Sequence, residues 1–168
     1  MNQFKTIPLQ KVDGVFERTG KDWMLISATD GENANTMTAS WGCLGVLWGK
    51  PVAICFIRPQ RYTYSITEKA DRLTLSFFEE QYRAALSYCG RTSGRDEDKF
   101  KGAGLSKVST KEGFVYPAEA SLVLMCRKLY ADDLKKASFL DPSLLSHYPI
   151  DDFHRVYICE IENALCKI

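Results

Sequence analysis

The segment Val52–Ile57, with the sequence VAICFI, constrains the fold of this chain more than any other stretch. All of its residues are apolar. A strand with one face in water alternates apolar and polar residues, whereas an unbroken apolar run of this length is typical of a strand buried on both faces. We therefore expect this segment to be a central strand of a sheet.

Other short segments extend this prediction to the whole chain. Further strands are expected where β-branched and aromatic residues gather, at 23–28, 73–78, 122–126 and 156–161. Short helices are expected at 64–70, 81–89 and 96–101, and residues 131–152, which contain two prolines, are expected to be an irregular excursion with a helical turn. Because strands and helices do not alternate regularly, the pattern favours a mainly β fold, an antiparallel barrel with short helical insertions, over a doubly wound sheet.

Length and charge limit the domain count and the partners. A chain of 168 residues is typical of one domain, which we expect to span 1–168. A net charge of +1 gives no electrostatic attraction to nucleic acid or to an anionic membrane, so neither is expected as a partner. No apolar run approaches the roughly 20 residues of a membrane span. The first residues, MNQFKTIPLQKVDG, lack the apolar core of a signal peptide, so we expect a cytoplasmic protein.

The six cysteines are predicted to be free thiols. None is spaced as CxxC, and several lie in apolar runs, where cysteine behaves as a small hydrophobic residue of a reducing compartment. The two histidines, His147 and His154, are too few for a histidine-based zinc site, and no spacing supports a mixed cysteine and histidine site. No metal is therefore expected.

The stretch NTMTASW, residues 35–41, has two interpretations. In an extended segment, Thr36, Thr38 and Ser40 share one face, while the larger or apolar side chains Met37, Ala39 and Trp41 share the other. The stretch is then either an edge strand with a polar outer face or a line of hydrogen-bonding groups facing a planar heteroaromatic ligand.

The stretch RPQRYT, residues 58–63, also has two interpretations. It is either a solvated turn in which Thr63 caps the following helix, or an anion site in which Arg58 and Arg61 bind a phosphate beside the helix N-terminus. A third cluster, RTSGRDEDKF at 91–100, is either a surface loop before a charged helix or a place where Ser93 and Gly94 bring backbone amides close to a ligand.

The sequence contains no recognisable pair of nucleophile and base, no GxGxxG and no P-loop. If the protein is an enzyme, a bound cofactor must therefore carry the chemistry.

Taken in order, the motifs N-x-M-T-A-S-W-G, W-G-K-P-V, R-P-x-R-Y-T and S-G-R-D-x-D-K-F resemble those of the flavin reductase-like family of FMN-binding split-barrel flavoproteins. The resemblance is greatest to the flavoredoxin-type members and covers residues 23–161. It implies a six-stranded antiparallel Greek-key split barrel, a homodimer and FMN bound near the subunit interface.

The resemblance also implies roles for individual residues. The residues expected to line the flavin ring are Thr36, Met37, Thr38 and Ser40, and Trp41 is a candidate for stacking near it. Asn35 and Ala39 are also expected to bind the cofactor. Those expected at the phosphate are Arg58, Arg61, Tyr62 and Thr63. Ser93 and Gly94 are expected at the flavin, and Lys99 either contacts it or organises the loop. Trp48 is expected either to stack near the ring or to pack in the core. His154 receives no role.

Two classes of function follow from the resemblance. The first is an oxidoreductase, either an NAD(P)H-dependent flavin reductase or a flavoredoxin-type protein that passes electrons from FMN to a redox partner protein. The second is an FMN carrier or sensor without reductase activity. Heme or pyridoxal phosphate on a related barrel is a third and more distant alternative. No motif distinguishes NADH from NADPH or identifies the electron acceptor.

Overall fold

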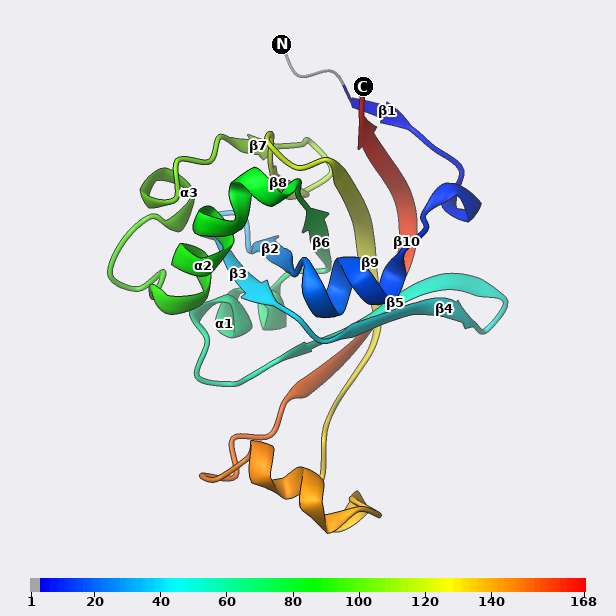
Figure 1. Ribbon diagram of the computed structural model, residues 1–168, viewed down its shortest axis with the longest axis vertical. Helices are drawn as coiled ribbons and strands as arrows, with labels where there is room; N and C mark the ends of the chain where they lie inside the picture. The colour runs from blue at the N-terminus through cyan, green and yellow to red at the C-terminus, as the bar shows by residue number, and fades with distance from the viewer. Residues whose placement is uncertain (1–3) are drawn as a thin grey trace.

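A computed structural model describes residues 4–168 and shows a mainly β antiparallel fold with short helices (Figure 1). The fold class predicted from the sequence is confirmed. The main sheet is ordered β3-β2-β6-β9-β10-β5-β4, with β1 paired to β10. Its strands are β1 (Phe4–Thr6), β2 (Met24–Thr29), β3 (Ala34–Ala39), β4 (Gly42–Leu47), β5 (Lys50–Ile57), β6 (Arg72–Phe77), β9 (Leu122–Asp133) and β10 (Arg155–Lys167). A separate pair consists of β7 (Lys107–Ser109) and β8 (Val115–Pro117).

The main sheet of the described residues has eight strands, whereas the family resemblance implied six. The sequence analysis did not predict β1, which is three residues long, or β4. β4 pairs with β5 through a tight turn in which Trp48 and Gly49 both have left-handed backbones, with φ of 53° and 68°. Trp48 is 59% exposed at this turn, so it does not pack in the core.

The exposure of β5 differs from the expected burial on both faces. The strand lies between β10 and β4, and Ala53, Cys55 and Ile57 on one face are buried. On the other face, Ile54 and Phe56 remain partly exposed. The prediction of burial on both faces was wrong for this end of the strand, because Phe56 faces a surface cleft rather than a second layer of protein.

Apolar cores lie on both faces of the sheet, and β2 contributes side chains to each of them. Its neighbours Leu25 and Ile26 are both fully buried, yet they belong to different cores because successive side chains of a strand point to opposite faces. Ile26 packs inside the curved sheet. Leu25 packs in the second core with Leu86 and Phe100, which come from the covering helices.

The three α-helices lie close to their predicted positions and are α1 (Tyr62–Lys69), α2 (Arg83–Arg91) and α3 (Lys99–Gly102). α3 begins where Asp98 accepts hydrogen bonds from two backbone amides. α1 has Arg61 at its N-cap, so the interpretation of Thr63 as the cap was wrong; Thr63 is buried within the first turn. The remaining helical turns are a π-helix (Glu17–Lys21) and four 3-10 helices (Leu9–Lys11, Glu80–Tyr82, Lys136–Ser138 and Pro142–His147). No helix of residues 4–168 is long and apolar enough to cross a membrane.

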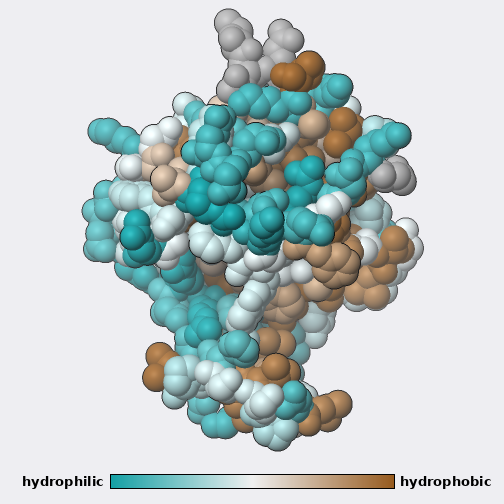
Figure 2. All heavy atoms as spheres, in the orientation of Figure 1, coloured by the Kyte–Doolittle hydropathy of each residue, from teal (hydrophilic) through white to brown (hydrophobic). Residues whose placement is uncertain are grey.

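β9 and β10 run further than the sequence indicated, and residues 134–154 connect them. We call this segment the arm. Its two 3-10 helices agree with the expected irregular excursion. Figure 1 shows the helical part of the arm standing away from the barrel, and Figure 2 shows hydrophobic residues on the arm's surface. Among them, Leu140 is 100% exposed and Ile150 is 79% exposed.

All six cysteines are free, and four of them (Cys55, Cys89, Cys126 and Cys159) are buried. Burial within apolar strands and helices is what their sequence context predicted.

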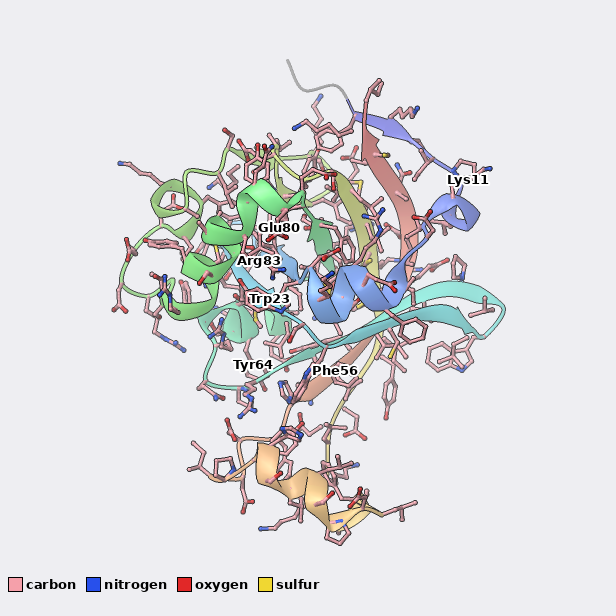
Figure 3. All side chains as sticks on the ribbon, in the orientation of Figure 1. Lys11, Trp23, Phe56, Tyr64, Glu80 and Arg83 are labelled. Carbon is pink, nitrogen blue, oxygen red and sulfur yellow. The ribbon has the colours of Figure 1, made fainter. Side chains whose placement is uncertain are left out.

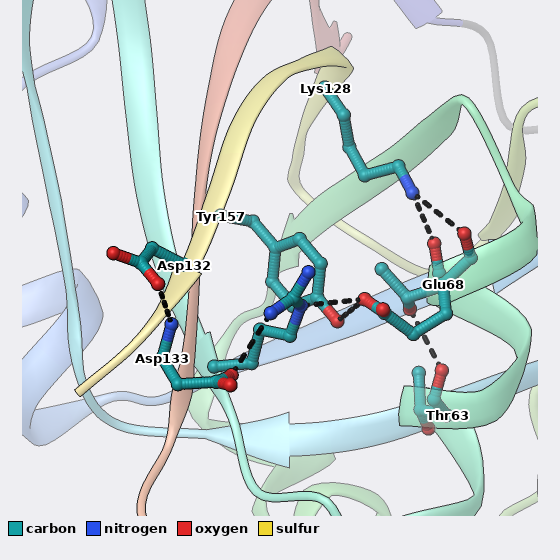
Figure 4. Close-up of polar contacts among 8 residues, drawn as sticks. Thr63, Glu68, Lys128, Asp132, Asp133 and Tyr157 are labelled. Atoms are coloured by element: carbon teal, nitrogen blue, oxygen red, sulfur yellow. Dashed lines mark hydrogen bonds and ion pairs between the residues drawn. The ribbon is translucent and has the colours of Figure 1, made fainter. Parts of the chain in front are cut away.

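A polar network joins α1 to β9 and β10 (Figure 4). Glu68, in the last turn of α1, accepts hydrogen bonds from the Tyr157 hydroxyl at 2.6 Å and from Arg155 Nε at 3.0 Å. Lys128 Nζ donates to the carbonyls of Thr67 and Glu68 at 2.5 and 3.3 Å, a favourable position for a cation at a helix C-terminus. Burial and the Glu68 carboxylate raise the pKa of Tyr157, so this side chain acts as a hydrogen-bond donor.

We predict that Tyr157→Phe lowers the free energy of unfolding by about 1–2 kcal/mol, because a bond to a charged acceptor is lost inside the protein while water partly screens Glu68. Urea denaturation measures this change. Tyr130→Phe is the matched control, since Tyr130 is 48% exposed and its hydroxyl bonds Asp132 at 3.2 Å near the surface. Equal effects of the two substitutions would contradict the prediction.

Candidate functional site

An open cleft of about 410 Å³ lies at the C-terminal end of β3, within the size range of natural ligand sites. Seven residues predicted for the site line it: Met37, Thr38, Ala39, Ser40, Trp41, Arg58 and Arg61. Seven lining residues were not assigned to the site: Trp23, Phe56, Leu86, Ser87, Gly90, Arg91 and His154. The lining set contains three arginines and no acidic residue, so the cleft favours an anionic ligand.

The first wall of the cleft is the end of β3, and its faces differ from those expected. Met37 and Thr38 both line the cleft although they are neighbours in an extended strand, and so do Ala39, where β3 ends, and the two residues after it. Thr36, predicted at the ring, is fully buried instead. Its hydroxyl accepts a hydrogen bond from Ser27 at 2.8 Å, which directs it toward β2.

The second wall is α2, which contributes Leu86, Ser87, Gly90 and Arg91. The Thr38 hydroxyl donates to the Leu86 carbonyl and so joins β3 to α2. No motif pointed to α2 as part of the site, although a helix was expected at 81–89. The Arg91 side chain has no hydrogen bond or ion pair with any residue of the described chain, so its guanidinium is available to a ligand.

Trp23 lines the cleft just before β2 and has a left-handed backbone with φ of 67°, which is uncommon for a residue other than glycine. The Arg83 guanidinium lies 4.4 Å from the centre of its ring and donates to the Lys21 carbonyl at 2.8 Å. Figure 3 shows Trp23 beside Arg83, with Phe56 further along the same side of the molecule. These contacts fix the position of the Trp23 ring.

The two arginines of the RPQRYT motif have different surroundings. Arg58 forms an ion pair with Asp152 and donates to the His147 carbonyl at 2.9 Å, so it also anchors the arm. Arg61 donates through Nη1 to the Gly90 carbonyl at 2.9 Å, and its other N–H groups have no partner among the described residues. Burial lowers the pKa of Arg61, but a guanidinium remains a cation at neutral pH. Arg61 is thus the better placed of the two to receive a phosphate.

Several predicted residues lie beneath the cleft instead of lining it. Asn35 is buried, and its Nδ2 donates to Thr63 Oγ1 at 3.0 Å. Gly94 lies directly against Asn35, since a Cβ built on Gly94 would be 2.3 Å from Asn35 Oδ1. Ser93 Oγ accepts from the Arg95 amide, and the Arg95 guanidinium lies 5.3 Å from the centre of the Tyr62 ring. These residues hold α1 and the loop at residues 92–98 against β3.

Lys99 was expected either to contact the flavin or to organise the loop, and its contacts fit the second role. It is 3% exposed, lies outside the cleft lining and donates from Nζ to the Cys89 carbonyl at 2.7 Å. Burial, followed by the nearby Arg61 charge, lowers its pKa to about 8. Lys99 and Arg61 therefore bind consecutive carbonyls at the end of α2 and hold that wall in place.

His154 reaches the cleft from the end of the arm, and no signal in the sequence assigned it to the site. It is 8% exposed, and Tyr148 bonds its Nδ1 at 2.8 Å. Burial, followed by the Arg58 charge, lowers its pKa to about 4, against the opposite effect of Asp152. His154 is therefore neutral near pH 7.

Comparison with known proteins decides the family. A sequence model of the flavin reductase-like domain matches residues 16–167 of the 168. The chain belongs to the flavin reductase-like family. The family predicted from the motifs is therefore confirmed. Among curated proteins, none matches the chain in sequence.

Solved structures share the flavin reductase-like fold. An FMN-binding domain of a flavin reductase-like enzyme from Shewanella baltica has a TM-score of 0.71 at 17% identity, covering 98% of this chain and 78% of that chain. Flavoredoxin of Desulfovibrio vulgaris has a TM-score of 0.65 at 21% identity, covering 84% and 67%. An NADH:FAD oxidoreductase of Streptomyces globisporus has a TM-score of 0.64 at 16% identity, covering 85% and 73%. At these identities the likeness establishes the fold and leaves the activity open.

Within residues 4–168, no group of three or more histidine, cysteine or acidic side chains is arranged to hold a metal ion.

We predict that Gly94→Ala in this flavin reductase-like domain lowers the free energy of unfolding by about 1–3 kcal/mol, because the new methyl group displaces Asn35 and breaks its bond to Thr63. Gly45→Ala is the control, since nothing lies within 4 Å of a Cβ at Gly45. Urea denaturation of both variants checks this. An unchanged Gly94→Ala variant would show that Asn35 does not lock the loop.

Proposed function

We propose that this flavin reductase-like protein binds FMN in the cleft and acts as an oxidoreductase, either an NAD(P)H-dependent flavin reductase or a flavoredoxin-type electron carrier. The supporting observation is the composition of the cleft, which combines apolar walls with three arginines and no acidic side chain. A ligand with a flat ring and an anionic tail matches that combination. The names of the structural relatives, which include an FMN-binding domain, a flavoredoxin and an NADH:FAD oxidoreductase, agree with both forms of the activity.

The residues present fit FMN. Met37, Trp41 and Phe56 offer apolar surface to the faces of a ring. Ser40 and Ser87 have no hydrogen-bond partner in the described part of the chain, so their hydroxyls are free for the polar edge of the ring.

The phosphate would be held by guanidinium groups. Arg61 stands at the N-cap of α1, where unpaired backbone amides and the helix dipole also favour an anion. Arg91, unpaired and exposed at the end of α2, adds a second cation. Arg58 contributes only if its ion pair with Asp152 opens, so it is the weaker candidate.

The protein's part in the reaction is to bind and orient. When bound, FMN supplies hydride and electron-transfer chemistry that no side chain of this chain offers. The aromatic wall of Trp41 and Phe56 excludes water from one side of the cleft, while its open side leaves room for NAD(P)H or a redox partner. Lys99 binds the Cys89 carbonyl of α2, and Asn35 binds Thr63 of α1, so these two buried side chains hold the helices beside the cleft in place.

The visible spectrum of the purified protein tests this proposal. Flavin absorption that copurifies with the chain, or appears when FMN is added, is the expected result. Anaerobic addition of NADH and of NADPH in separate samples should then bleach it, and the faster donor is the one that the protein prefers. Failure to bind FMN would overturn the proposal. Binding without bleaching by either donor would instead support the FMN carrier or sensor, or a protein that receives electrons from a partner.

We predict that Arg61→Ala raises the dissociation constant of FMN by roughly ten- to a hundredfold, because a charge-assisted hydrogen bond to a phosphate is worth on the order of 1.5–3 kcal/mol. Riboflavin lacks the phosphate, so its affinity should change far less. Arg61→Lys should recover only part of the loss, since an ammonium cannot reproduce the planar fork. Equal weakening of FMN and riboflavin would mean that Arg61 acts only through its bond to Gly90.

We further predict a homodimer. Trp41, Val46 and Trp48 on the β4–β5 side are 42%, 79% and 59% exposed, and a second copy would remove this apolar surface from water. Light scattering at micromolar concentration should give twice the 19.0 kDa of one chain. A mass near that of one chain would contradict the prediction.

A further inference from the structure

The arm delivers two side chains, Tyr148 and His154, that the proposed flavin site does not use. His154 lines the cleft although more than nine tenths of its surface is buried. Its ring centre lies 5.1 Å from that of Trp41 and 6.3 Å from that of Phe56. The imidazole is therefore a polar group set in an aromatic wall.

The hydrogen bonds of Tyr148 determine which nitrogen of His154 carries the proton. The Tyr148 hydroxyl lies 2.8 Å from His154 Nδ1 and has no other acceptor among residues 4–168. If Nδ1 carried the proton, the buried Tyr148 hydroxyl would have no acceptor for its own hydrogen, so the arrangement in which Tyr148 donates to Nδ1 is favoured. The neutral imidazole then holds its own proton on Nε2.

His154 Nε2–H is thus a hydrogen-bond donor at the cleft wall. It has no partner in the described part of the chain, and the residue lines the cleft, so this donor is available to a ligand there. Its depressed pKa, about 4, means that the group is uncharged near pH 7. An uncharged donor in apolar surroundings suits a neutral acceptor better than an anion, which the arginines would attract.

Tyr148 itself is held firmly. Its ring centre lies 5.8 Å from that of Phe139 and 4.8 Å from that of Phe153, both on the arm. The Arg58 guanidinium lies 5.2 Å from the ring centre on another side. These contacts keep the hydroxyl directed at His154.

We propose that Tyr148 is a positioning residue that holds His154 as a neutral Nε2–H donor, and that this donor binds a neutral carbonyl oxygen of a ligand in the cleft. Two ligands share this chemistry. One is FMN itself through a carbonyl of its ring, and this part rests on the proposed function. The other is a small aromatic carbonyl compound, whose binding does not require FMN to be the cofactor.

The tautomer is tested by NMR of the full chain labelled with ¹⁵N. Long-range ¹H–¹⁵N spectra at pH 7 distinguish imidazoles protonated at Nε2 from those protonated at Nδ1. The chain has two histidines, so His147→Gln assigns the signals of His154. We expect the Nε2–H pattern in the natural chain and a mixture of tautomers in Tyr148→Phe. An Nδ1–H pattern or an imidazolium in the natural chain would overturn the proposal, whether or not FMN binds.

The ligand is tested with FMN, with acetophenone as the carbonyl probe and with ethylbenzene as its counterpart without oxygen. His154→Leu should weaken at least one of the first two by about three- to tenfold, as expected for one neutral hydrogen bond, and leave ethylbenzene unchanged. His154→Gln, which keeps an N–H donor, should recover part of the loss. Weakening of FMN identifies the flavin carbonyl as the acceptor, and weakening of acetophenone alone identifies a separate compound. No change for either ligand, or an equal loss for ethylbenzene, would overturn the proposal.

Discussion

The antiparallel pairing of β9 with β10 is the interaction on which the rest of the structure depends. The two strands pair from Leu122 and Cys166 at one end to Asp133 and Arg155 at the other. β6 pairs with β9, while β5 and β1 pair with β10, so the remaining strands of the sheet attach to this pair through their neighbours. Two irregularities in the register, between Ile158 and Cys159 and between Ile161 and Asn163, occur along β10, and such bulges bend a strand and increase its twist.

The same pairing places functional groups. Where the ladder ends at Asp133 and Arg155, the chain leaves the sheet as the arm and returns with His154 at the cleft. Just inside that end, Arg155 and Tyr157 hold Glu68 of α1. The position of α1 sets the position of Arg61 at its N-cap. The extension of two strands beyond the barrel therefore fixes both the arm and the proposed phosphate end of the cleft.

Sequence reasoning pointed to the residues around the cleft better than it identified which of them line it. Residues 37–41, Arg58 and Arg61 line the cleft because apolar and polar groups alternate just where β3 ends, and because the arginines follow a buried strand. Thr36 and Lys99 belong to the same motifs but are buried and bind protein groups instead. A motif therefore predicts the region of a site. Which of its residues face the ligand depends on where the strand ends and on which nearby backbone carbonyls need a hydrogen-bond donor.

The remaining residues that line the cleft could not be predicted from the sequence, because only tertiary packing brings them to it. Leu86, Arg91 and His154 are far from residues 37–41 along the chain, and only the packing of α2 and the arm brings them together. Apolar runs and turn residues were enough to predict a mainly β fold, because burial patterns and turn chemistry are local properties. The order of the motifs indicated the family, and several residues near the cleft, only through its resemblance to a known family. The tautomer of His154, the anchoring of Arg58 by the arm and the unpaired state of Arg91 were decided only by the tertiary structure, because each depends on which polar groups remain without a partner once distant segments have packed.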